Sequence, residues 1–386
     1  MVSLSNHYAK CIGLRQAQTD NTFHLSLHLP NNISLICITG KTNCPGGTLY
    51  LMLKQTNKIA VVGGGSWATA NIKMLTDNIT EKEIFWWMRN GEAVQHIREF
   101  GHNPNYLSSV EIKVPAQNIS TDLRSLIHQV DFILLNVPAA FLKEALIGIT
   151  PADLKGKKIV SAIKGIVPDE NKIIGEFLNE NYDVPFDHIL VISGPCHAEE
   201  VALEKLSYLT IASQNTELAA VFAAMLSTRY IKTIVSDDIY GTEYGAVLKN
   251  VYAIASGICH GVGYGDNFQA VLISNAIREL ERFVDEVHPI DRDIKESAYL
   301  GDLLVTAYSQ FSRNRTFGNM IGKGYTVKSA QLEMNMIAEG YYAVNCLHQV
   351  NRQYNVDMPI CEAVYAILYK KSPPVIEMQK LAEKLS

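Results

Sequence analysis

Lys249 is the residue whose surroundings best suit it to exchanging protons. It stands in the mainly apolar stretch LKNVYAIASG (248–257), within a predicted helix over 243–260. A free lysine has a pKa of about 10.4, and burial or a neighbouring cation lowers that pKa toward neutral pH. The alternative is a lysine whose alkyl chain lies along the surface and whose ammonium group stays in water. The residues alone leave both interpretations open.

A glycine-rich turn, GGGSWA (63–68), could hold phosphate groups. It follows a short apolar stretch at 58–62 and opens a predicted helix. In this G-x-G-x-x-A pattern, Gly63 permits a tight turn, Gly65 lets a pyrophosphate approach the backbone, and Ala68 allows close packing of helix and strand. The free N–H groups and the positive dipole at the helix N-terminus favour anions. We therefore predict a dinucleotide site at Gly63, Gly65, Ser66 and Trp67, against the alternative of a merely glycine-rich turn.

The end of the second predicted strand, over 83–88, bears on the choice of dinucleotide. No Asp or Glu stands there to bind a ribose 2′-hydroxyl, since Glu83 lies at the beginning of the strand. Arg89 follows the strand, and a guanidinium suits a 2′-phosphate, so NADP should be accepted. The alternative for Arg89 is a solvated surface charge, and NAD is not excluded.

The remaining pattern predicts how these residues are positioned. Further apolar strands are predicted at 131–137, 158–162, 188–193, 208–212 and 230–235. Strands of near-continuous apolar character that alternate with helices indicate a mostly parallel sheet covered on both faces. After about residue 240 only helical patterning continues. The predicted fold class is α/β, with a Rossmann-type doubly wound parallel sheet over 52–240 followed by an all-helical domain over 241–386.

Residues 1–51 are rich in turns and show no persistent period. One interpretation is a misassigned start, with translation beginning at Met52. The other is a real but dispensable extension. A protein that begins at Met52 decides between them, because loss of solubility or activity would show that the extension matters.

Composition limits the classes of function. The chain has 386 residues, 47% hydrophobic and 19% charged, which suits a globular protein with a sizeable core. A net charge of −5 argues against a general nucleic-acid binder. Seven cysteines without a spacing framework suggest reduced thiols in the cytoplasm. We expect no membrane span, no signal peptide and no metal site, because the sequence shows none of their patterns.

Four motifs, in order, resemble the NAD(P)-dependent glycerol-3-phosphate dehydrogenase family. They are GGGSWATA (63–70), SGPCHAEEV (193–201), LKNVYAIASG (248–257) with GDN (265–267), and GDL (301–303) with SRNRTFG (312–318). The resemblance extends from about residue 57 to the C-terminus. It implies an oxidoreductase that interconverts sn-glycerol 3-phosphate and dihydroxyacetone phosphate by hydride transfer with NADP(H) or NAD(H). In cells this family usually makes the glycerol backbone of phospholipids.

The resemblance also implies three catalytic residues. Lys249 is the proton acceptor. Lys164, at the end of the predicted strand 158–162, is a second cation that orients substrate beside the nicotinamide and helps lower the pKa of Lys249. Asp302 hydrogen-bonds the glycerol hydroxyls or holds Lys249 in place. The alternatives are an ordinary loop lysine for Lys164 and a helix-capping aspartate for Asp302.

Further residues follow from the resemblance as binding residues. Ser312, Arg313 and Asn314 correspond to a clamp for the substrate phosphate and the cofactor, since the planar arginine fork donates two parallel hydrogen bonds to phosphate. A solvated basic turn is the alternative. The remaining positions are Ala198 and Glu339 for the cofactor, with Glu339 equally explained as a surface residue, and Gly194 and Cys196 for the substrate.

Cys196 departs from the family, which commonly has Ser or Thr at this position. A thiol is the weaker hydrogen-bonding group, so contact there should rest on the backbone. Nucleophilic catalysis by Cys196 with His197 is disfavoured because adjacent residues rarely aim at each other.

Two other functions stay open on the sequence. A related hydroxy-acid dehydrogenase would share the two-domain plan but not the Ser-Arg-Asn segment. A non-catalytic nucleotide sensor would not need both Lys164 and Lys249. The expected partner is a small-molecule substrate, and the sequence does not determine the oligomeric state, with a homodimer among the open arrangements.

Overall fold

The computed structural model describes residues 14–19, 22–27, 57–334 and 338–386, and the chain divides into two compact units, 1–54 and 55–386. In the first unit, β1 (Leu14–Thr19) and β2 (Thr22–Leu27) pair as antiparallel strands. The question of a start at Met52 lies outside the described residues.

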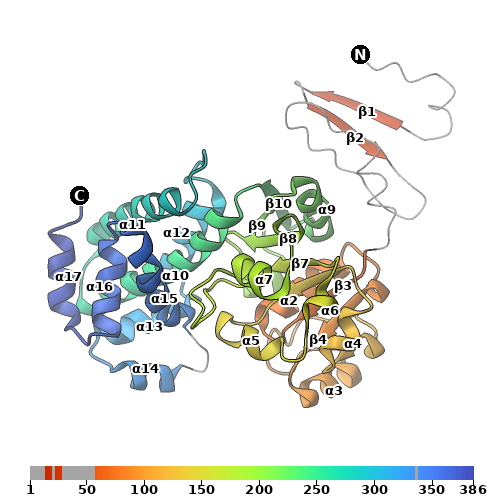
Figure 1. The fold of residues 1–386 in the computed structure, drawn as a ribbon, viewed down its shortest axis with the longest axis horizontal. Coiled ribbons are helices and arrows are strands. Elements are labelled where there is room, and N and C mark those ends of the chain that lie inside the picture. Colours follow the sequence, from red (N-terminus) through yellow and green to blue (C-terminus); the bar gives the residue numbers. More distant parts are fainter. Residues whose placement is uncertain (1–13, 20–21, 28–56, 335–337) are drawn as a thin grey trace. The chain divides into compact units, whose positions relative to one another are not determined.

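The second unit begins with an eight-stranded sheet. Its strands are β3 (Ile59–Val62), β4 (Ile84–Trp87), β5 (Ile119–Ser120), β6 (Phe132–Leu135), β7 (Lys158–Ser161), β8 (Ile189–Ser193), β9 (Ser207–Ala212) and β10 (Ile231–Ser236). Their spatial order is β10-β9-β8-β7-β6-β3-β4-β5. Figure 1 labels these strands except β5 and β6. Neighbours are parallel except β8 and β9, so β9 and β10 run against the other six. The predicted mostly parallel sheet is confirmed.

Helices cover both faces of this sheet. Along β3, Ile59 and Val61 belong to one apolar cluster, whereas Ala60 and Val62 belong to another, because successive strand residues point to opposite faces. The first cluster includes α2 (Ser66–Thr76), α3 (Gly91–Phe100), α8 (Ala198–Ala202) and α9 (Thr216–Leu226). The second includes α4 (Leu123–Ile127), α5 (Leu142–Ala145), α6 (Pro151–Leu154) and α7 (Ile174–Tyr182). This two-sided burial explains why the strands are apolar without alternation.

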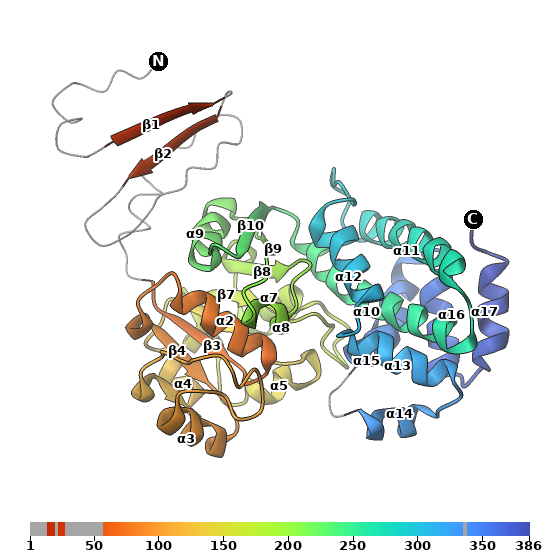
Figure 2. The same ribbon diagram turned by 180° about the vertical axis from the view of Figure 1, so that it is seen from behind.

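Only helices and turns follow Ser236 among the described residues, as predicted (Figures 1 and 2). The helices are α10 (Ile239–Val262), α11 (Asp266–Val287), α12 (Asp302–Tyr308), α13 (Arg313–Gly322), α14 (Val327–Glu333), α15 (Glu339–Tyr354), α16 (Pro359–Leu368) and α17 (Pro374–Ala382). The long helix α10 is buried along most of its length and packs against α11, α12, α13, α15 and α16.

Glycines let α10 and α13 cross at backbone contact. A Cβ atom on Gly257 would overlap the carbonyl oxygen of Arg315, and one on Gly318 would overlap that of Ile254. Any larger residue would push the two helices apart. The crossing therefore holds the lysine-bearing helix beside the helix that begins with the Ser-Arg-Asn segment.

Two local features were not predicted. Strand β5 has only two residues, too few to show a periodic pattern. A π-helical turn, Ser297–Gly301, stands directly before Asp302. Such turns are rare overall, and a large share of them occur at functional sites.

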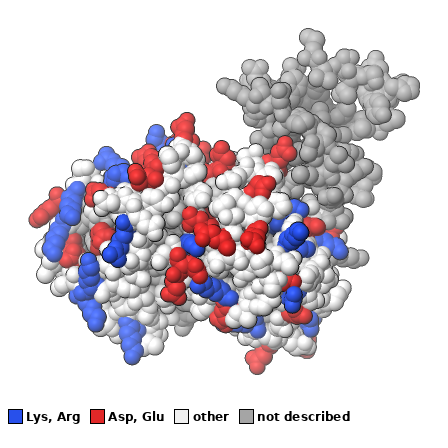
Figure 3. Space-filling model, in the orientation of Figure 1, with Lys and Arg blue, Asp and Glu red and all other residues white. Residues whose placement is uncertain are grey.

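Positive and negative side chains are interspersed on the face drawn in Figure 3. No extended basic surface of the kind that nucleic acids require is seen on this face. Within the described ranges, no helix has the length and apolar character needed to cross a bilayer.

Candidate active site

A cleft of about 870 Å³ lies at the carboxyl ends of the parallel strands. Its lining includes the turns after β3, β4, β6, β7 and β8 and residues of the helices α10, α12, α13 and α15 that follow the sheet. Open α/β sheets bind ligands at this edge. The predicted dinucleotide turn and the predicted catalytic lysines therefore line the same cleft.

The glycine turn at the start of α2 is open toward the cleft. Gly63 has a φ of +131°, and a Cβ there would overlap the Asn136 carbonyl, so the turn requires glycine. In the part of the chain that the structure describes, no atom lies within 4 Å of the place where a Cβ of Gly65 would stand. Among the described residues, no side chain caps the α2 N-terminus and none bonds the buried indole N–H of Trp67. The cradle fits an anionic pyrophosphate.

A polar network that the sequence analysis missed holds this turn. Asn103 Nδ2 donates to the Gly64 carbonyl at 3.0 Å and to Thr69 Oγ1 at 2.9 Å. Asn71 Nδ2 donates to Asn136 Oδ1 at 3.0 Å. Asn103 and Asn136 lie far from the glycine motif in sequence, so no local pattern could have identified them.

Three charged residues meet at the centre of the cleft. The Lys249 ammonium is paired with Asp302 Oδ1, and Lys164 Nζ lies 3.3 Å from Asp302 Oδ2. The Lys249 and Asp302 side chains are only 5% and 2% exposed, and that of Lys164 is 20% exposed. The structure thus brings together the three residues that the resemblance indicated as catalytic, from a sheet turn and two helices.

Groups at the end of β8 and in the turn after it hydrogen-bond to the Asp302 carboxylate. Ser193 Oγ and the Gly194 N–H approach Asp302 Oδ2 at 3.3 and 3.4 Å. Gly194 has a φ of +123°, and a Cβ there would overlap the Tyr208 carbonyl. Gly194, predicted to bind substrate, lies beside Asp302 and is not among the residues that line the cleft.

Burial and mutual charge shift the three pKa values. Burial lowers the pKa of Lys249 to about 7, the charge of Lys164 acts in the same direction, and Asp302 opposes them. Burial is the largest effect on Lys164 and acts to lower its pKa as well, but Asp302, Lys249 and Cys196 together outweigh it and the pKa is raised. Burial would raise the pKa of Asp302, but the two lysines lower it. One lysine is therefore easily deprotonated while the other stays charged.

A chain of amides connects the lysines with α13 and α15. Asn250 Nδ2 donates to the Lys164 carbonyl at 3.0 Å, and Asn314 Nδ2 donates to Asn250 Oδ1 at 2.9 Å. Asn314 Oδ1 accepts from the Gly340 N–H at 3.0 Å. Asn250 was missed by the sequence analysis, although its place beside Lys249 was a signal. Thr306, also missed, lines the cleft and donates to the Asp302 carbonyl at 2.6 Å.

The predicted phosphate clamp lies at the start of α13. Ser312 accepts from the Arg315 N–H at 3.3 Å and caps the helix. Arg313 is exposed in the cleft and has no ion-pair partner within the described part of the chain. Glu339, on α15, also lines the cleft, and burial raises its pKa to about 7 although the Arg313 charge opposes this. An unpaired guanidinium in a cleft can take an anion.

The segment after β8 also faces the cleft. Burial raises the pKa of Cys196 to about 12, so its thiol stays protonated and is a poor nucleophile. Burial, then Lys164 and Lys249, lower the pKa of His197, so this imidazole stays neutral. Ala198 begins α8 and lines the cleft with its two neighbours.

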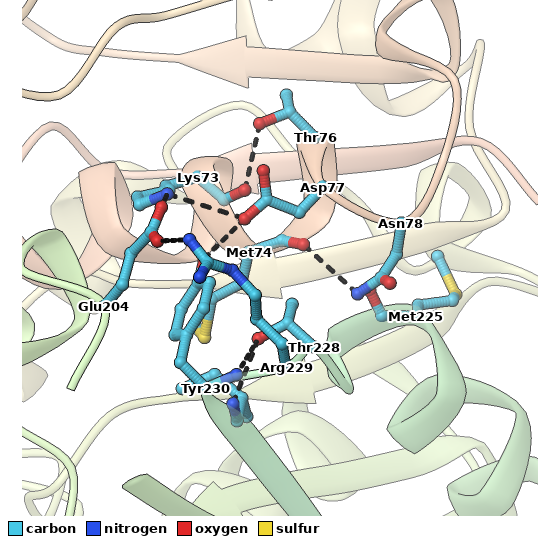
Figure 4. Close-up of polar contacts among 11 residues, drawn as sticks. Lys73, Met74, Thr76, Asp77, Asn78, Glu204, Met225, Thr228, Arg229 and Tyr230 are labelled. Carbon is cyan, nitrogen blue, oxygen red and sulfur yellow. Dashed lines mark hydrogen bonds and ion pairs between the residues drawn. The ribbon is translucent and has the colours of Figure 1, made fainter. Parts of the chain in front are cut away.

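Another ion-pair network lies outside the cleft lining (Figure 4). Lys73, near the end of α2, lies 2.8 Å from Glu204, which also pairs with Arg229. The Tyr230 hydroxyl donates to Asp77 at 2.5 Å. These contacts tie the end of α2 to the turns before β9 and β10, a structural role. Within the described ranges, no three His, Cys, Asp or Glu side chains are grouped to hold a metal ion.

Replacing Asp302 with Asn should destabilise the protein strongly. Two buried ammonium groups would lose their shared counter-charge, so we expect the free energy of unfolding to fall by about 3 kcal/mol in urea denaturation. The control is Glu180→Gln, which removes an exposed ion pair with Lys172 and should cost about 0–1 kcal/mol. Equal losses for the two variants would contradict the role given to Asp302.

Comparison with known proteins identifies the family. Residues 58–219 match the family described as "NAD-dependent glycerol-3-phosphate dehydrogenase N-terminus", and residues 238–379 match its "C-terminus" counterpart. The chain is 33% identical over 328 residues to glycerol-3-phosphate dehydrogenase (NAD(P)+) of Oceanobacillus iheyensis, covering 85% of this chain and 94% of the relative. It is also 33% identical to the Bacillus subtilis enzyme, covering 81% and 90%.

Solved structures agree with this match. The crystal structure of glycerol-3-phosphate dehydrogenase from Coxiella burnetii is 28% identical and has a TM-score of 0.78, with 85% of this chain and 99% of that chain covered. A D-mandelate dehydrogenase in complex with NADH, 19% identical with a TM-score of 0.53, shares the fold alone. The chain belongs to the family of NAD(P)-dependent glycerol-3-phosphate dehydrogenases.

Proposed function

We propose that this protein interconverts sn-glycerol 3-phosphate and dihydroxyacetone phosphate with NADP(H) or NAD(H). The observation that carries the proposal is the convergence of Lys249 and Lys164 on Asp302 in the cleft that also contains the glycine turn and Arg313. A proton donor, a fixed cation and an anion site are the groups that this reaction needs.

The cofactor would lie along the sheet edge. The backbone of Gly63, Gly65, Ser66 and Trp67 would bind its pyrophosphate, and Arg89 would meet a 2′-phosphate. Lys164, Ala198, Arg313 and Glu339 would contact its nicotinamide half. When bound, the nicotinamide supplies or accepts the hydride that moves at the C2 carbon of the substrate. The burial of Lys249 and Asp302 limits the contact of these two side chains with water.

Lys249 would move the proton. In the oxidation direction its neutral amine accepts the hydrogen of the C2 hydroxyl, and in the reduction direction its ammonium returns a proton to the carbonyl oxygen. Lys164 keeps its charge beside Asp302 and stabilises the oxygen as negative charge develops. Asp302 orients both amines and offsets the charge that the pair carries when both are protonated.

The far end of the substrate would lie toward α13. Arg313, with Ser312 and Asn314 beside it, would bind the phosphate, and the backbone near Cys196 would contact the rest of the substrate. A hydrogen bond to a charged group contributes about 1.5–3 kcal/mol. Two such bonds explain a preference for the phosphorylated substrate over glycerol.

We extend the proposal to the domain organisation of the protein and its location in the cell. A dinucleotide domain over 52–240 and a substrate domain over 241–386 fit the change from sheet to helices after β10. Cytoplasmic location, with the product used for phospholipid synthesis, is supported by four described cysteines that are free and buried.

Lys249→Ala should reduce turnover strongly without abolishing cofactor binding. NADPH and NADH absorbance is followed after dihydroxyacetone phosphate is added, and kcat should fall by about 10³-fold because general acid–base catalysis contributes roughly 10²- to 10⁴-fold. The dissociation constant for NADPH, measured by fluorescence titration, should stay within about threefold of the wild-type value. In binding free energy this is well under about 1.4 kcal/mol, which corresponds to a tenfold change. Lys172→Ala, at an exposed ion pair, is the control.

Turnover by Lys249→Ala at close to the wild-type rate would refute the assigned role. Nucleotide binding by the wild type without reaction on dihydroxyacetone phosphate would favour a sensor, and reaction on a hydroxy acid alone would favour the related dehydrogenases.

The two reaction directions should depend oppositely on pH. Because burial lowers the pKa of Lys249 to about 7, the neutral amine predominates above that pH and the ammonium below it. We expect kcat for oxidation of glycerol 3-phosphate to rise with pH through about 7 and kcat for reduction to fall. Initial rates over the range in which the protein stays folded test this. Profiles that rise together would show that another group controls the proton.

A further inference from the structure

An ion pair lies at the end of the cleft where the sheet edge meets the dinucleotide turn. Arg89 follows β4, and its Nη1 lies 2.8 Å from Oε1 of Glu144 on α5. Both residues line the cleft, with side chains 69% and 50% exposed. The arginine predicted to meet a 2′-phosphate is therefore already paired with a carboxylate.

Other polar groups near Arg89 are engaged elsewhere. The Asn90 side chain accepts from the N–H groups of Glu92 and Ala93, at 2.9 and 3.2 Å, and caps α3. Among the described carboxylates that line the cleft, Glu144 is the one paired with Arg89.

Phe141 gives Arg89 a second support. The Arg89 guanidinium carbon lies 5.8 Å from the centroid of the Phe141 ring, which also lines the cleft. A cation within about 6 Å of an aromatic face is attracted to it. If the ion pair with Glu144 is broken, the Arg89 guanidinium still contacts the Phe141 ring and stays at the wall of the cleft.

We propose that Glu144 is a specificity-determining residue that reduces the preference for NADP over NAD by pairing with Arg89. The inference rests on the proposed function, since it concerns the same cofactor site. A 2′-phosphate must either displace Glu144 from Arg89 or bind beside the negative charge of the Glu144 carboxylate, and both lower its affinity. A 2′-hydroxyl carries no charge, so its binding requires neither. Because the pair is exposed, its attraction is weak enough for a phosphate to open it. A single site then accepts both cofactors.

The test is equilibrium binding, which needs no turnover. Dissociation constants for NADPH and NADH are measured by nucleotide fluorescence with the full chain. In Glu144→Gln, NADPH should bind about three- to tenfold more tightly, whereas the dissociation constant for NADH should change by less than about twofold. The reason is that NADPH carries a doubly charged 2′-phosphate next to the removed carboxylate, and NADH has a hydroxyl there. An unchanged ratio of the two constants would overturn the proposal.

Variants of Arg89 separate the mechanism from general charge repulsion. Arg89→Gln should weaken NADPH binding, and Glu144→Gln added to it should shift the NADPH constant much less than in the wild type. An equally large shift in both backgrounds would show that Glu144 does not act through Arg89 and would overturn the proposal.

Glu170→Gln is the matched control. It removes the same charge from an ion pair with Lys143, the neighbour of Glu144 on α5, and Glu170 is not among the residues lining the cleft. The ratio of constants should stay at the wild-type value, and a shift as large as that of Glu144→Gln would overturn the inference. Wild-type protein that binds neither nucleotide would refute the proposed function together with the inference, whereas binding without turnover would refute the proposed function alone.

Discussion

One buried carboxylate shared by two ammonium groups is the interaction on which the site depends. Asp302 is almost fully buried, and Lys249 and Lys164 each approach one of its oxygens. Two like charges could not be buried together without it, because the desolvation of each ion costs several kcal/mol. One carboxylate neutralises only one of two ammonium groups, so the second lysine is the more easily deprotonated. Two identical side chains thus differ in how easily they lose a proton, which is what the roles proposed for Lys249 and Lys164 require.

The rest of the fold keeps these groups in place. Lys164 depends on the parallel sheet, since it follows β7 at the carboxyl edge. Lys249 depends on α10, whose crossing with α13 is possible only at glycines. Asn250 and Asn314 connect the lysine turn to the helices through direct hydrogen bonds. A substitution far from the cleft can therefore change the distance between the two amines.

Features of the fold were predicted correctly from the sequence where they depend on residues close together in the chain. Apolar strand runs and the glycine turn predicted the sheet and the start of α2, because strand burial and φ values depend on nearby residues. The context of Lys249 was ambiguous, since an apolar helix can bury a lysine or let it reach water. The family motifs, not the pattern of single residues, pointed to Lys164 and Asp302.

What escaped prediction depends on contacts between distant segments. Asn103 supports the glycine turn from 39 residues away, and Glu144 reaches Arg89 from 55 residues away. Thr306 bonds the backbone of Asp302 within one helix, but its direction toward the cleft follows from packing that no local pattern records. Strand β5 exists because β4 offers it an edge, and two residues carry no periodic signal.

The most direct test of the central interaction is an NMR pH titration of the Lys249 amino group. Lysine labelled with carbon-13 at Cε is incorporated into the full chain, and the Lys249 signal is assigned by its loss in Lys249→Met. The structure predicts a midpoint at about pH 7, caused by burial and the charge of Lys164 against the opposing charge of Asp302. A midpoint at about 10.4, the value of a solvated lysine, would contradict the account.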